Sequence, residues 1–344
     1  MKISHILMPA ALFNVDPSFI ASSAEQSIDE SSARCSGFWI IREISIAMMR
    51  ESRWLLLLLF LVLFDSVDAS SQEHGSDLVK TGQYIFSLAG GCACHTVPRE
   101  VFNAGARAFP IPFGKVYSTN ITQDKETGLG TWTDQQIRDA IVKGIRRDGS
   151  RIIPVMPYQA YSGMAEEDLQ ALIAYLKTLK PVKKPTPELQ SQAPFTRSLG
   201  IPIYLRVFGR FSKSPAQAPK SGIERGRYLV EHVSLCGDCH TPRNFIGVPN
   251  RSLYLAGAGA KSSPLGEDIP NITPDKETGI GDWKREDIAE LLLTGIKPDF
   301  DNVQGLMAEV IQGAPHGFKD MKREDALAIA DYLKSIRPNK NKIK

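Results

Sequence analysis

Residues 234–244 of the chain read SLCGDCHTPRN. Two residues separate Cys236 from Cys239, and His240 follows the second cysteine directly. Cys-x-x-Cys-His is the pattern to which c-type haem is attached, because two thioether bonds hold the porphyrin edge and the adjacent imidazole reaches the iron. This stretch therefore predicts a covalent haem site, and a group of that size decides which fold can form around it.

Residues 89–98 read AGGCACHTVP and contain a shortened version of the same pattern. One residue separates Cys92 from Cys94, and His95 again follows directly. The adjacency of Cys94 and His95 is what iron ligation needs, so we expect haem here as well. The pattern leaves open whether Cys92 forms a thioether with a distorted loop, stays free, or marks an error in the sequence.

The composition is that of an ordinary globular protein of 344 residues, with a formal net charge of +3 and 42% hydrophobic residues. No basic block with interleaved aromatic residues is present, which excludes a typical nucleic-acid binder. Residues 339–344 form only a short basic tail. Four of the five cysteines lie in the two motifs and the fifth is Cys35, so the cysteines do not form a disulfide framework.

The stretch RESRWLLLLLFLVLFDSVDASS has basic residues, a short apolar run and small residues before Ser70, which is typical of a secretory signal. We predict a signal peptide over 48–69, cleaved after Ala69, and interpret 1–47 as a non-native or disordered extension. An uncleaved membrane anchor is the alternative. Export places the mature protein in the periplasm, where haem is attached covalently.

The chain repeats itself. NITQDKETGLGTW begins at Asn120 and NITPDKETGIGDW begins at Asn271, an offset of 151 residues. Self-similarity at a fixed offset indicates two copies of one structural unit. We predict domains over 76–182 and 221–338, called here the first and the second repeat, which are joined by a Pro-rich linker over 183–220.

The repeat explains the shortened motif. Cys92 is eight positions after Tyr84, and Cys236 is eight positions after Tyr228. The first cysteines of the two motifs therefore align, and so do the two histidines. The missing residue lies between the cysteines, so we interpret the first motif as a haem site with a shortened loop.

Apolar residues recur at helical spacing near the end of each repeat. They are Leu169, Leu172, Ile173, Leu176 and Leu179 in the first repeat and Leu327, Ile329, Ala330, Leu333 and Ile336 in the second. No alternating run is long enough to indicate a sheet. The sequence predicts an all-α fold with short helices and long loops around covalent haem. The linker reads as extended, with an apolar patch over 201–211 that either packs across both repeats or lies on the surface.

A second iron ligand should occupy equivalent places in both repeats. Met156 and Met307 are again 151 residues apart, and we expect each to lie in a loop after the middle helix. Methionine sulfur is a common partner of histidine in cytochromes and raises the reduction potential. Met164 and Met321 also match, but they open the last helix and are interpreted as packing residues.

Other histidines and other metals are weaker candidates. His232 and His316 have no counterparts in the other repeat, so surface or local hydrogen-bonding roles are expected. A zinc knuckle is the alternative for the cysteines, but a structural zinc site needs four ligands and would break the repeat. A carbonyl near each motif histidine is expected to accept a hydrogen bond from Nδ1 and orient the ring.

Three segments of the sequence resemble a known protein family. RGRYLVEHVSLCGDCHTPRN, NITPDKETGIGDW and MAEVI are similar to segments of class I cytochrome c domains, in particular the cytochrome c subunits of periplasmic alcohol and gluconate dehydrogenases. The resemblance implies two tandem class I domains, two covalently bound haem c groups, histidine and methionine ligation, and electron carriage. Those subunits usually carry three haem motifs, and this sequence has two.

Two classes of function follow from this resemblance. The first is a periplasmic di-haem carrier between a dehydrogenase or other donor and a terminal oxidase or other cytochrome, with membrane association possible through a complex. The alternative is a di-haem enzyme, peroxidase-like or thiosulfate dehydrogenase-like, that acts at one haem. A metal-binding or scaffold module without haem is a third hypothesis, which a colourless exported protein would support.

Overall fold

The computed structural model describes residues 75–111, 114–191, 196–313 and 315–343, and it describes only the backbone of Cys92 and Ser191. These residues belong to one compact unit, Asp68–Lys344. The predicted extension over 1–47 and the predicted signal peptide over 48–69, with Cys35, lie outside the described residues.

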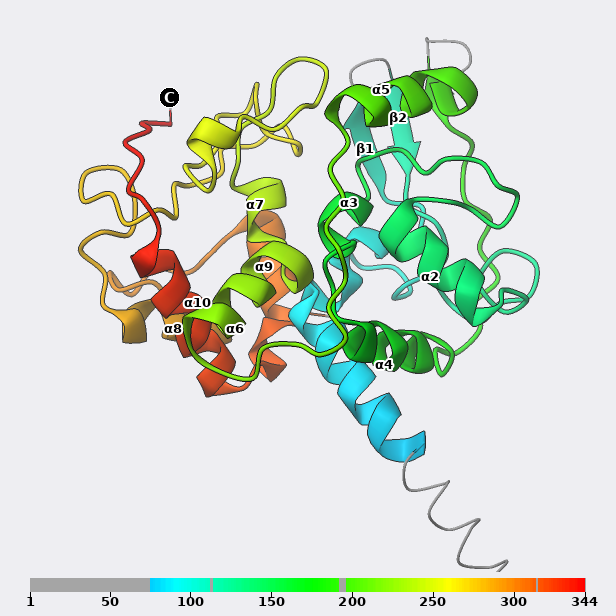
Figure 1. Cartoon of the computed structure of the whole chain (residues 1–344), viewed down its shortest axis with the longest axis horizontal. Helices are drawn as coiled ribbons and strands as arrows, with labels where there is room; N and C mark the ends of the chain where they lie inside the picture. The colour runs from blue at the N-terminus through cyan, green and yellow to red at the C-terminus, as the bar shows by residue number, and fades with distance from the viewer. Residues whose placement is uncertain (1–74, 112–113, 192–195, 314, 344) are drawn as a thin grey trace, which may run out of the picture. The chain divides into compact units, whose positions relative to one another are not determined.

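The first repeat begins with a helix whose described part covers residues 75–88. The elements after it are η1 (Gly90–His95), β1 (Ala108–Ile111), β2 (Gly114–Tyr117), α2 (Asp134–Lys143), α3 (Tyr158–Tyr161) and α4 (Glu166–Leu176). The linker contributes β3 (Gln190–Ser191), η2 (Thr196–Gly200) and α5 (Ile201–Phe208). Figure 1 shows α5 beside the β1–β2 hairpin, with α4 at the opposite end of this repeat.

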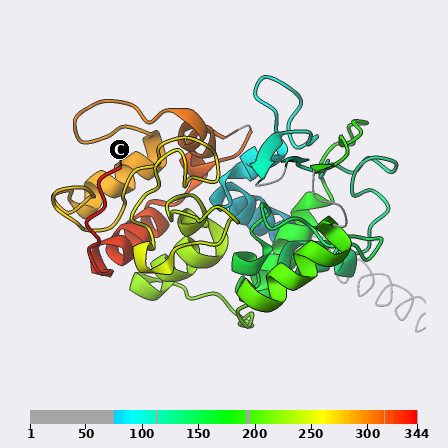
Figure 2. The same cartoon turned by 90° about the horizontal axis from the view of Figure 1, so that it is seen from above.

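The second repeat follows the same order of a leading helix, a motif turn, a long loop and closing helices. Its elements are α6 (Gly222–Tyr228), η3 (Leu229–Val233), α7 (Cys236–Cys239), η4 (Arg251–Leu253), α8 (Arg285–Thr294), α9 (Gly305–Gln312), η5 (Phe318–Asp320) and α10 (Arg323–Ser335). Long irregular segments join α7 to α8, as Figure 2 shows. The prediction of a helix-rich chain with short helices and long loops is confirmed.

In each repeat the leading helix crosses the last helix at a glycine. A Cβ atom at Gly82 would lie 1.8 Å from the carbonyl oxygen of Ala171 in α4. A Cβ atom at Gly226 would lie 1.9 Å from the carbonyl oxygen of Ala328 in α10. Only glycine permits this approach of two backbones, so the crossing is encoded by one residue type at equivalent positions.

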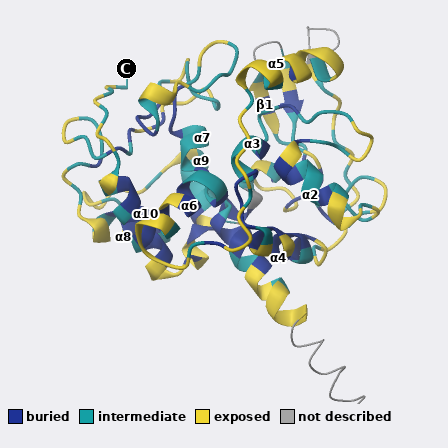
Figure 3. Cartoon of the chain, in the orientation of Figure 1, coloured by how far each residue is buried: buried dark blue, intermediate teal, exposed yellow. Residues whose placement is uncertain are grey.

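The core is continuous between the repeats. Ile85, Leu172 and Tyr175 of the first repeat belong to the same buried cluster as Leu229 and Ile329 of the second. Figure 3 shows many buried residues in α4 and α10. No helix within the described residues has both the length and the apolar character needed to span a bilayer.

Two tyrosine hydroxyls link the repeats reciprocally. The Tyr228 hydroxyl donates to Asp168 at 2.7 Å and accepts from the backbone N–H of Ala165 at 3.0 Å. Ala165 is the N-cap of α4 and Asp168 its third residue. In many helices the side chain of that third residue bonds to the N-cap N–H directly, as part of a capping box. Here a tyrosine of the other repeat stands between the two groups.

The equivalent link runs in the opposite direction. The Tyr84 hydroxyl donates to Asp325 at 2.7 Å and accepts from the N–H of Lys322, the N-cap of α10, at 3.1 Å. Arg225 also donates to both oxygens of Asp325, at 2.9 and 2.8 Å. Among the described residues, Asp168 has no such ion pair. The two links are alike in geometry but differ in charge.

A small sheet departs from the all-α prediction. Strands β1, β2 and β3 form a three-stranded antiparallel sheet in that order. Phe109 pairs with Val116, and both are buried together with Ile153 and Ile201. The strands have four residues or fewer, which is too short for alternation to stand out in the sequence.

The linker is also more ordered than predicted. It is not extended throughout, since it contains β3, η2 and α5. Ile201 and Leu205 of α5 pack against the sheet cluster. The opposite side of the helix is exposed, including Ile203 and Val207. One face of the helix is thus buried, as in an amphipathic helix. Leu265 of the second repeat belongs to the same cluster, and the Tyr204 hydroxyl lies 3.5 Å from the Gly247 carbonyl, so the patch contacts both repeats.

We expect Tyr228→Phe and Tyr84→Phe to lower the free energy of unfolding by about 1–3 kcal/mol each, since each leaves a carboxylate and an N–H without their shared partner. The loss should be larger for Tyr228→Phe, because Asp325 keeps Arg225 in the other link. Denaturant unfolding of the complete chain measures both values. Tyr117→Phe, in strand β2, is the control, and an equal loss there would contradict the capping role.

The two aspartates should respond to pH in opposite directions. Burial raises the pKa of Asp325, but the hydrogen bonds and charge of Arg225 outweigh it and hold that pKa below the ordinary value of 3.8. Burial raises the pKa of Asp168, and the Tyr228 hydrogen bond offsets only part of this rise. The folded state thus favours the charged form of Asp325 and the protonated form of Asp168.

Because its folded pKa is lowered, Asp325 stabilises the protein above pH 3.8 and loses this effect as the pH falls through the folded pKa. The destabilisation by Asp325→Asn should therefore shrink as the pH falls. Asp168 should behave in the opposite way, because its folded pKa is raised. As the pH falls through that pKa, the free energy of unfolding of the natural protein should rise relative to that of Asp168→Asn. Denaturant unfolding as a function of pH measures both trends, and parallel trends would contradict the assignment.

Candidate functional site

The second motif forms one turn of helix. Helix α7 spans Cys236–Cys239 and His240 ends it, with the His240 N–H bonded to the Cys236 carbonyl at 2.9 Å. The His240 side chain is buried, with 9% of its surface exposed. Its Nδ1 lies 2.8 Å from the carbonyl oxygen of Pro270. The motif turn thus places the imidazole in the interior with one nitrogen already bonded.

The first motif is built in the same way despite its missing residue. The turn η1 covers Gly90–His95, and His95 Nδ1 lies 2.7 Å from the carbonyl oxygen of Thr119. Thr119 and Pro270 are themselves 151 residues apart, so both rings use the same position of the repeat. The His95 ring is partly exposed, whereas the His240 ring is buried. Shortening the loop has preserved the carbonyl contact of the histidine but not its degree of burial.

These contacts settle which nitrogen of each ring is protonated. A carbonyl oxygen can only accept, so Nδ1 must carry the hydrogen. Burial lowers the pKa of His95 and of His240, and the carbonyl bond raises each pKa only in part. Each neutral ring therefore presents an unprotonated Nε2, and no described residue hydrogen-bonds to it. A free imidazole Nε2 with an anchored Nδ1 is the usual arrangement of a metal-ligating histidine.

The repeated NIT loops hold the accepting carbonyls in place. The Asn120 amide donates to the Val182 carbonyl at 2.7 Å, and its oxygen accepts from the Thr122 N–H at 2.9 Å. Asn271 makes the same two bonds, to the Asn339 carbonyl at 2.7 Å and from the Thr273 N–H at 2.9 Å. Each asparagine directly follows the residue whose carbonyl orients a histidine. The most strongly repeated sequence thus serves to fix the ring orientation.

An arginine supports each motif turn at the same place. Arg243 donates to the carbonyl of Asp238 at 3.0 Å, and Arg107 donates to the carbonyl of Ala93 at 3.2 Å. Both carbonyls belong to the residue just before the second cysteine. Arg243 is near its motif in sequence, but Arg107 comes from the segment before β1. Sequence reasoning did not single out either arginine.

None of the described cysteine side chains, those of Cys94, Cys236 and Cys239, forms a disulfide. Burial raises the pKa of Cys236 to about 12. The Cys94 side chain is exposed, although desolvation by the surrounding protein atoms raises its pKa to about 11. The Cys92 side chain lies outside the described part of the structure.

The two motifs approach each other across the contact between the repeats. Cys94 lies within electrostatic range of Arg107 and also of Asp238 and Glu309, which both belong to the second repeat. Cys94 in turn acts on Cys239. The motifs, which are far apart in the sequence, are therefore neighbours in space.

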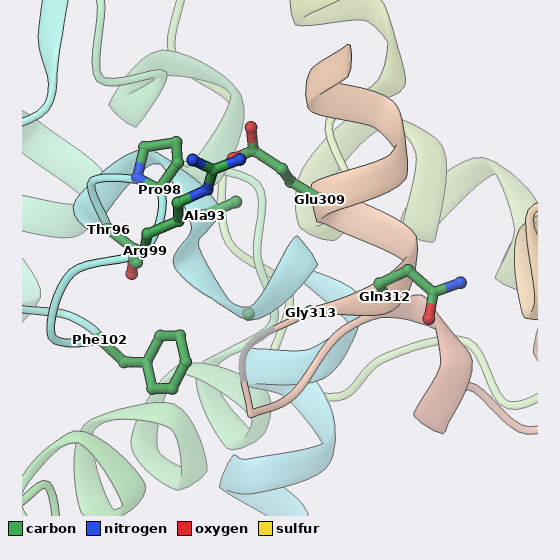
Figure 4. A pocket seen from close by; sticks show the side chains of 9 residues that line it. Ala93, Thr96, Pro98, Arg99, Phe102, Glu309, Gln312 and Gly313 are labelled. Carbon is green, nitrogen blue, oxygen red and sulfur yellow. The ribbon is translucent and has the colours of Figure 1, made fainter. Parts of the chain in front are cut away.

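A hollow of about 260 Å³ lies between the first motif turn and α9. Figure 4 shows Ala93, Thr96 and Pro98 on one side, with Glu309 and Gln312 on the other. Phe102 forms part of the wall of this hollow. The hollow is lined by both repeats, which again places the first motif at their contact.

The methionines are placed partly as predicted. Met156 lies in a bend between α2 and α3, as expected, and is partly buried against the core. Met307 was expected in a loop, which is wrong, because it is the third residue of helix α9. GLMAEVIQ contains no residue that breaks a helix after its first glycine, so the segment is helical. Met164 and Met321 are buried directly before α4 and α10, at the position of a hydrophobic staple.

Among the described residues two further histidines, His232 and His316, make contacts that are not merely local. His232 Nδ1 bonds to the carbonyl of Ala160 at 2.9 Å, and His316 lies 3.1 Å from the Gln83 amide nitrogen. Both contacts cross between the repeats. No sequence signal could have indicated this, since neither histidine has a counterpart in the other repeat.

The chemistry of the described residues fits covalent haem. Near the second motif, Arg243 Nε and Ser234 Oγ are buried without a hydrogen-bond partner among the described residues. Unpaired buried donors are costly and suit an anionic group such as a haem propionate. Among the described residues no three His, Cys, Asp or Glu side chains gather as a metal site. The described cysteines therefore do not form the four-ligand site that zinc requires.

Comparison with known proteins points in the same direction. No family model matches the chain. The fructose dehydrogenase cytochrome subunit of Gluconobacter japonicus is 39% identical over 263 residues, which cover 75% of this chain and 52% of that subunit. The cytochrome c subunit of the alcohol dehydrogenase (quinone) of Gluconacetobacter polyoxogenes is 35% identical over 286 residues, 81% of this chain and 60% of the subunit.

A shorter relative is matched over most of its length. The diheme cytochrome c-type protein of Cereibacter sphaeroides is 37% identical over 265 residues, which cover 74% of this chain and 84% of that protein. By contrast, the chain spans 52% and 60% of the length of the two dehydrogenase subunits. Similarity at this level extends well beyond the motifs themselves.

We expect Met307→Ala to retain covalent haem, because thioether attachment does not use this sulfur, and to lower the midpoint potential of one haem. Met156→Ala should do the same for the other haem. Redox titration followed by absorption measures both potentials. An unchanged potential in either variant would mean that another residue ligates that iron.

The matched control is Met321→Ala. This side chain is buried in the core, so its truncation should cost about 2–5 kcal/mol of stability. The two midpoint potentials should stay at their natural values. A fall in potential in this control would show that loosening the core is sufficient to change it.

Proposed function

The chain belongs to the c-type cytochromes, and we propose that it is a di-haem electron carrier of the periplasm that passes electrons from a dehydrogenase to a respiratory acceptor. The observation that carries this proposal is the matched pair of histidines. His95 and His240 each bond through Nδ1 to a carbonyl at the same repeat position, and each leaves Nε2 free. One chain thus offers two equivalent places for a ligated iron.

Each bound haem would supply a one-electron couple. The residues proposed to hold it divide into thioether cysteines, histidine ligands and methionine ligands. They are Cys92, Cys94, His95 and Met156 for the first haem, and Cys236, Cys239, His240 and Met307 for the second. The task of the protein is to keep each ring fixed, so that little rearranges when an electron arrives. The anchored imidazoles and the surrounding core serve this task.

We assign the repeats, over 76–182 and 221–338, to two tandem class I cytochrome c domains. The leading helix, motif turn and closing helix found in both repeats, the glycine crossings at Gly82 and Gly226, and the shared loop bonds support this assignment. The approach of the motifs at Cys94 and Cys239 favours electron passage within the chain.

The partners are proposed from the relatives and from the predicted signal. Two relatives are by name cytochrome subunits of fructose and alcohol dehydrogenases, which supports a dehydrogenase as the electron donor. The acceptor is a terminal oxidase or another cytochrome. The apolar run before Ala69 supports export to the periplasm, with membrane association through a complex.

The proposal is tested by counting covalent haems on purified exported protein. We expect the pyridine haemochrome assay to give two haems per chain, because both motifs keep the Cys-His adjacency. Neither haem should pass into acidified organic solvent, since thioether bonds survive it. A count of one haem per chain would mean that the first motif carries no covalent haem. A colourless protein would contradict the proposal as a whole.

The same material distinguishes the carrier from a di-haem enzyme. A carrier needs both axial positions filled, so neither reduced haem should bind carbon monoxide rapidly. Stopped-flow absorption measures this binding. Rapid binding at one haem would favour an oxidoreductase that acts there.

A further inference from the structure

The shortened first motif packs directly against helix α9 of the other repeat. A Cβ atom at Gly90 would lie 3.0 Å from Val310 of α9, and one at Gly91 would lie 1.7 Å from the carbonyl oxygen of His316. Both glycines have positive φ, at 72° and 59°. The turn can therefore meet the second repeat this closely only because two glycines precede its first cysteine.

Arg107 ties this turn to α9. Its Nη1 donates to the carbonyls of Ala93 at 3.2 Å and Thr96 at 3.4 Å, which flank Cys94 and His95. The same guanidinium bonds to both oxygens of Glu309, at 2.5 and 3.3 Å. The Arg107 side chain has 18% of its surface exposed and the Glu309 side chain 38%, so the guanidinium is largely sheltered while the carboxylate reaches solvent. One side chain thus holds both the motif turn and a helix of the other repeat.

The second motif has no such dependence. Arg243 bonds to the Asp238 carbonyl at 3.0 Å and to the Asp238 carboxylate at 2.5 Å, so its charge partner lies inside the motif itself. The residue at the matching place in the first motif is Ala93, which has no carboxylate. Glu309 supplies the missing charge from the other repeat. The charge partner of the arginine at the first turn therefore comes from the other repeat, whereas the charge partner at the second turn lies within its own motif.

Helix α9 presents different faces to the two sites. Met307 and Ile311 are four residues apart and share one face, and Ile311 is fully buried in the core. Glu309 is two residues beyond Met307, which places it on the far side of the helix. Gln312, near it, lines the hollow against the first motif. The helix proposed to ligate the second haem thus also braces the first motif, through Glu309 and Gln312 and through Val310, which lies against Gly90.

We infer that Arg107 is a positioning residue for the first haem, which fixes the Cys94-His95 turn by clamping it to Glu309 of the second repeat. This rests on the proposed function, since it assigns a haem to that turn. The first site then depends on the second repeat for its geometry, and the second site does not depend on Arg107 for its motif turn.

The test compares substitutions that keep or remove the charge of Arg107. Arg107→Lys keeps the charge, but one ammonium group cannot reproduce a planar fork that joins two carbonyls and two carboxylate oxygens. Arg107→Gln removes both charge and fork. The variants Met156→Ala and Met307→Ala identify which redox couple and which ferric EPR signal belong to each haem.

We expect both Arg107 variants to change the EPR signal and the midpoint potential of the first haem, by about tenfold in its reduced-to-oxidised ratio, or about 59 mV. Glu309→Gln should change the same couple, and the double variant should change it no more than the larger single change. Arg243→Lys should affect the second haem and leave the first unchanged.

Two results would overturn the inference while both haems remain attached. One is an Arg107→Lys protein with natural EPR signal and potential, because charge alone would then suffice. The other is additive behaviour of Arg107→Gln and Glu309→Gln in both the potential and the free energy of unfolding. If Arg107→Gln does not fold, Arg107→Lys and Glu309→Gln decide the question. Absence of haem from the natural protein would instead defeat the proposed function.

Discussion

The arrangement of the molecule depends on hydrogen bonds that cross between its repeats. Each repeat sends a tyrosine hydroxyl into the start of the other repeat's last helix, where it bonds to the N-cap N–H and to an aspartate. Four orphan N–H groups begin every helix, and here one of them is satisfied by a distant tyrosine. The last helices also form the glycine crossings with the leading helices. The links therefore fix both the inner packing of each repeat and the contact between them.

This contact brings the two motifs together and makes them unequal. The second motif contains its own arginine and carboxylate, Arg243 and Asp238. The first has lost one residue between its cysteines and uses Glu309 of the other repeat as its charge partner. The same inequality is found in the tyrosine links, where Asp325 is paired with Arg225 and Asp168 is not. The two repeats are thus not equivalent, because the second repeat supplies a charge that holds the motif turn of the first.

Much of the fold and of the site could be predicted from the sequence, because the signals were local or repeated. The Cys-His adjacency predicted the turns that carry His95 and His240, and the offset of 151 residues predicted that their surroundings match. The prediction that a carbonyl orients each ring is confirmed. The small sheet and α5 were missed, since strands of four residues or fewer and a helix of eight carry too little periodicity. Met307 was placed in a loop for a similar reason, because α9 is also short.

The sequence by itself determined the covalent motifs, the duplication and the helical character of the chain, since each is recorded in residues close together or repeated at one offset. Only the tertiary structure decided which groups meet across the repeats. Arg107 and Glu309 are 202 residues apart, and Tyr84 and Asp325 are 241 apart. In the sequence such residues resemble ordinary surface charges and core aromatics. Their pairing follows from the packing of whole helices, which no local pattern of residues records.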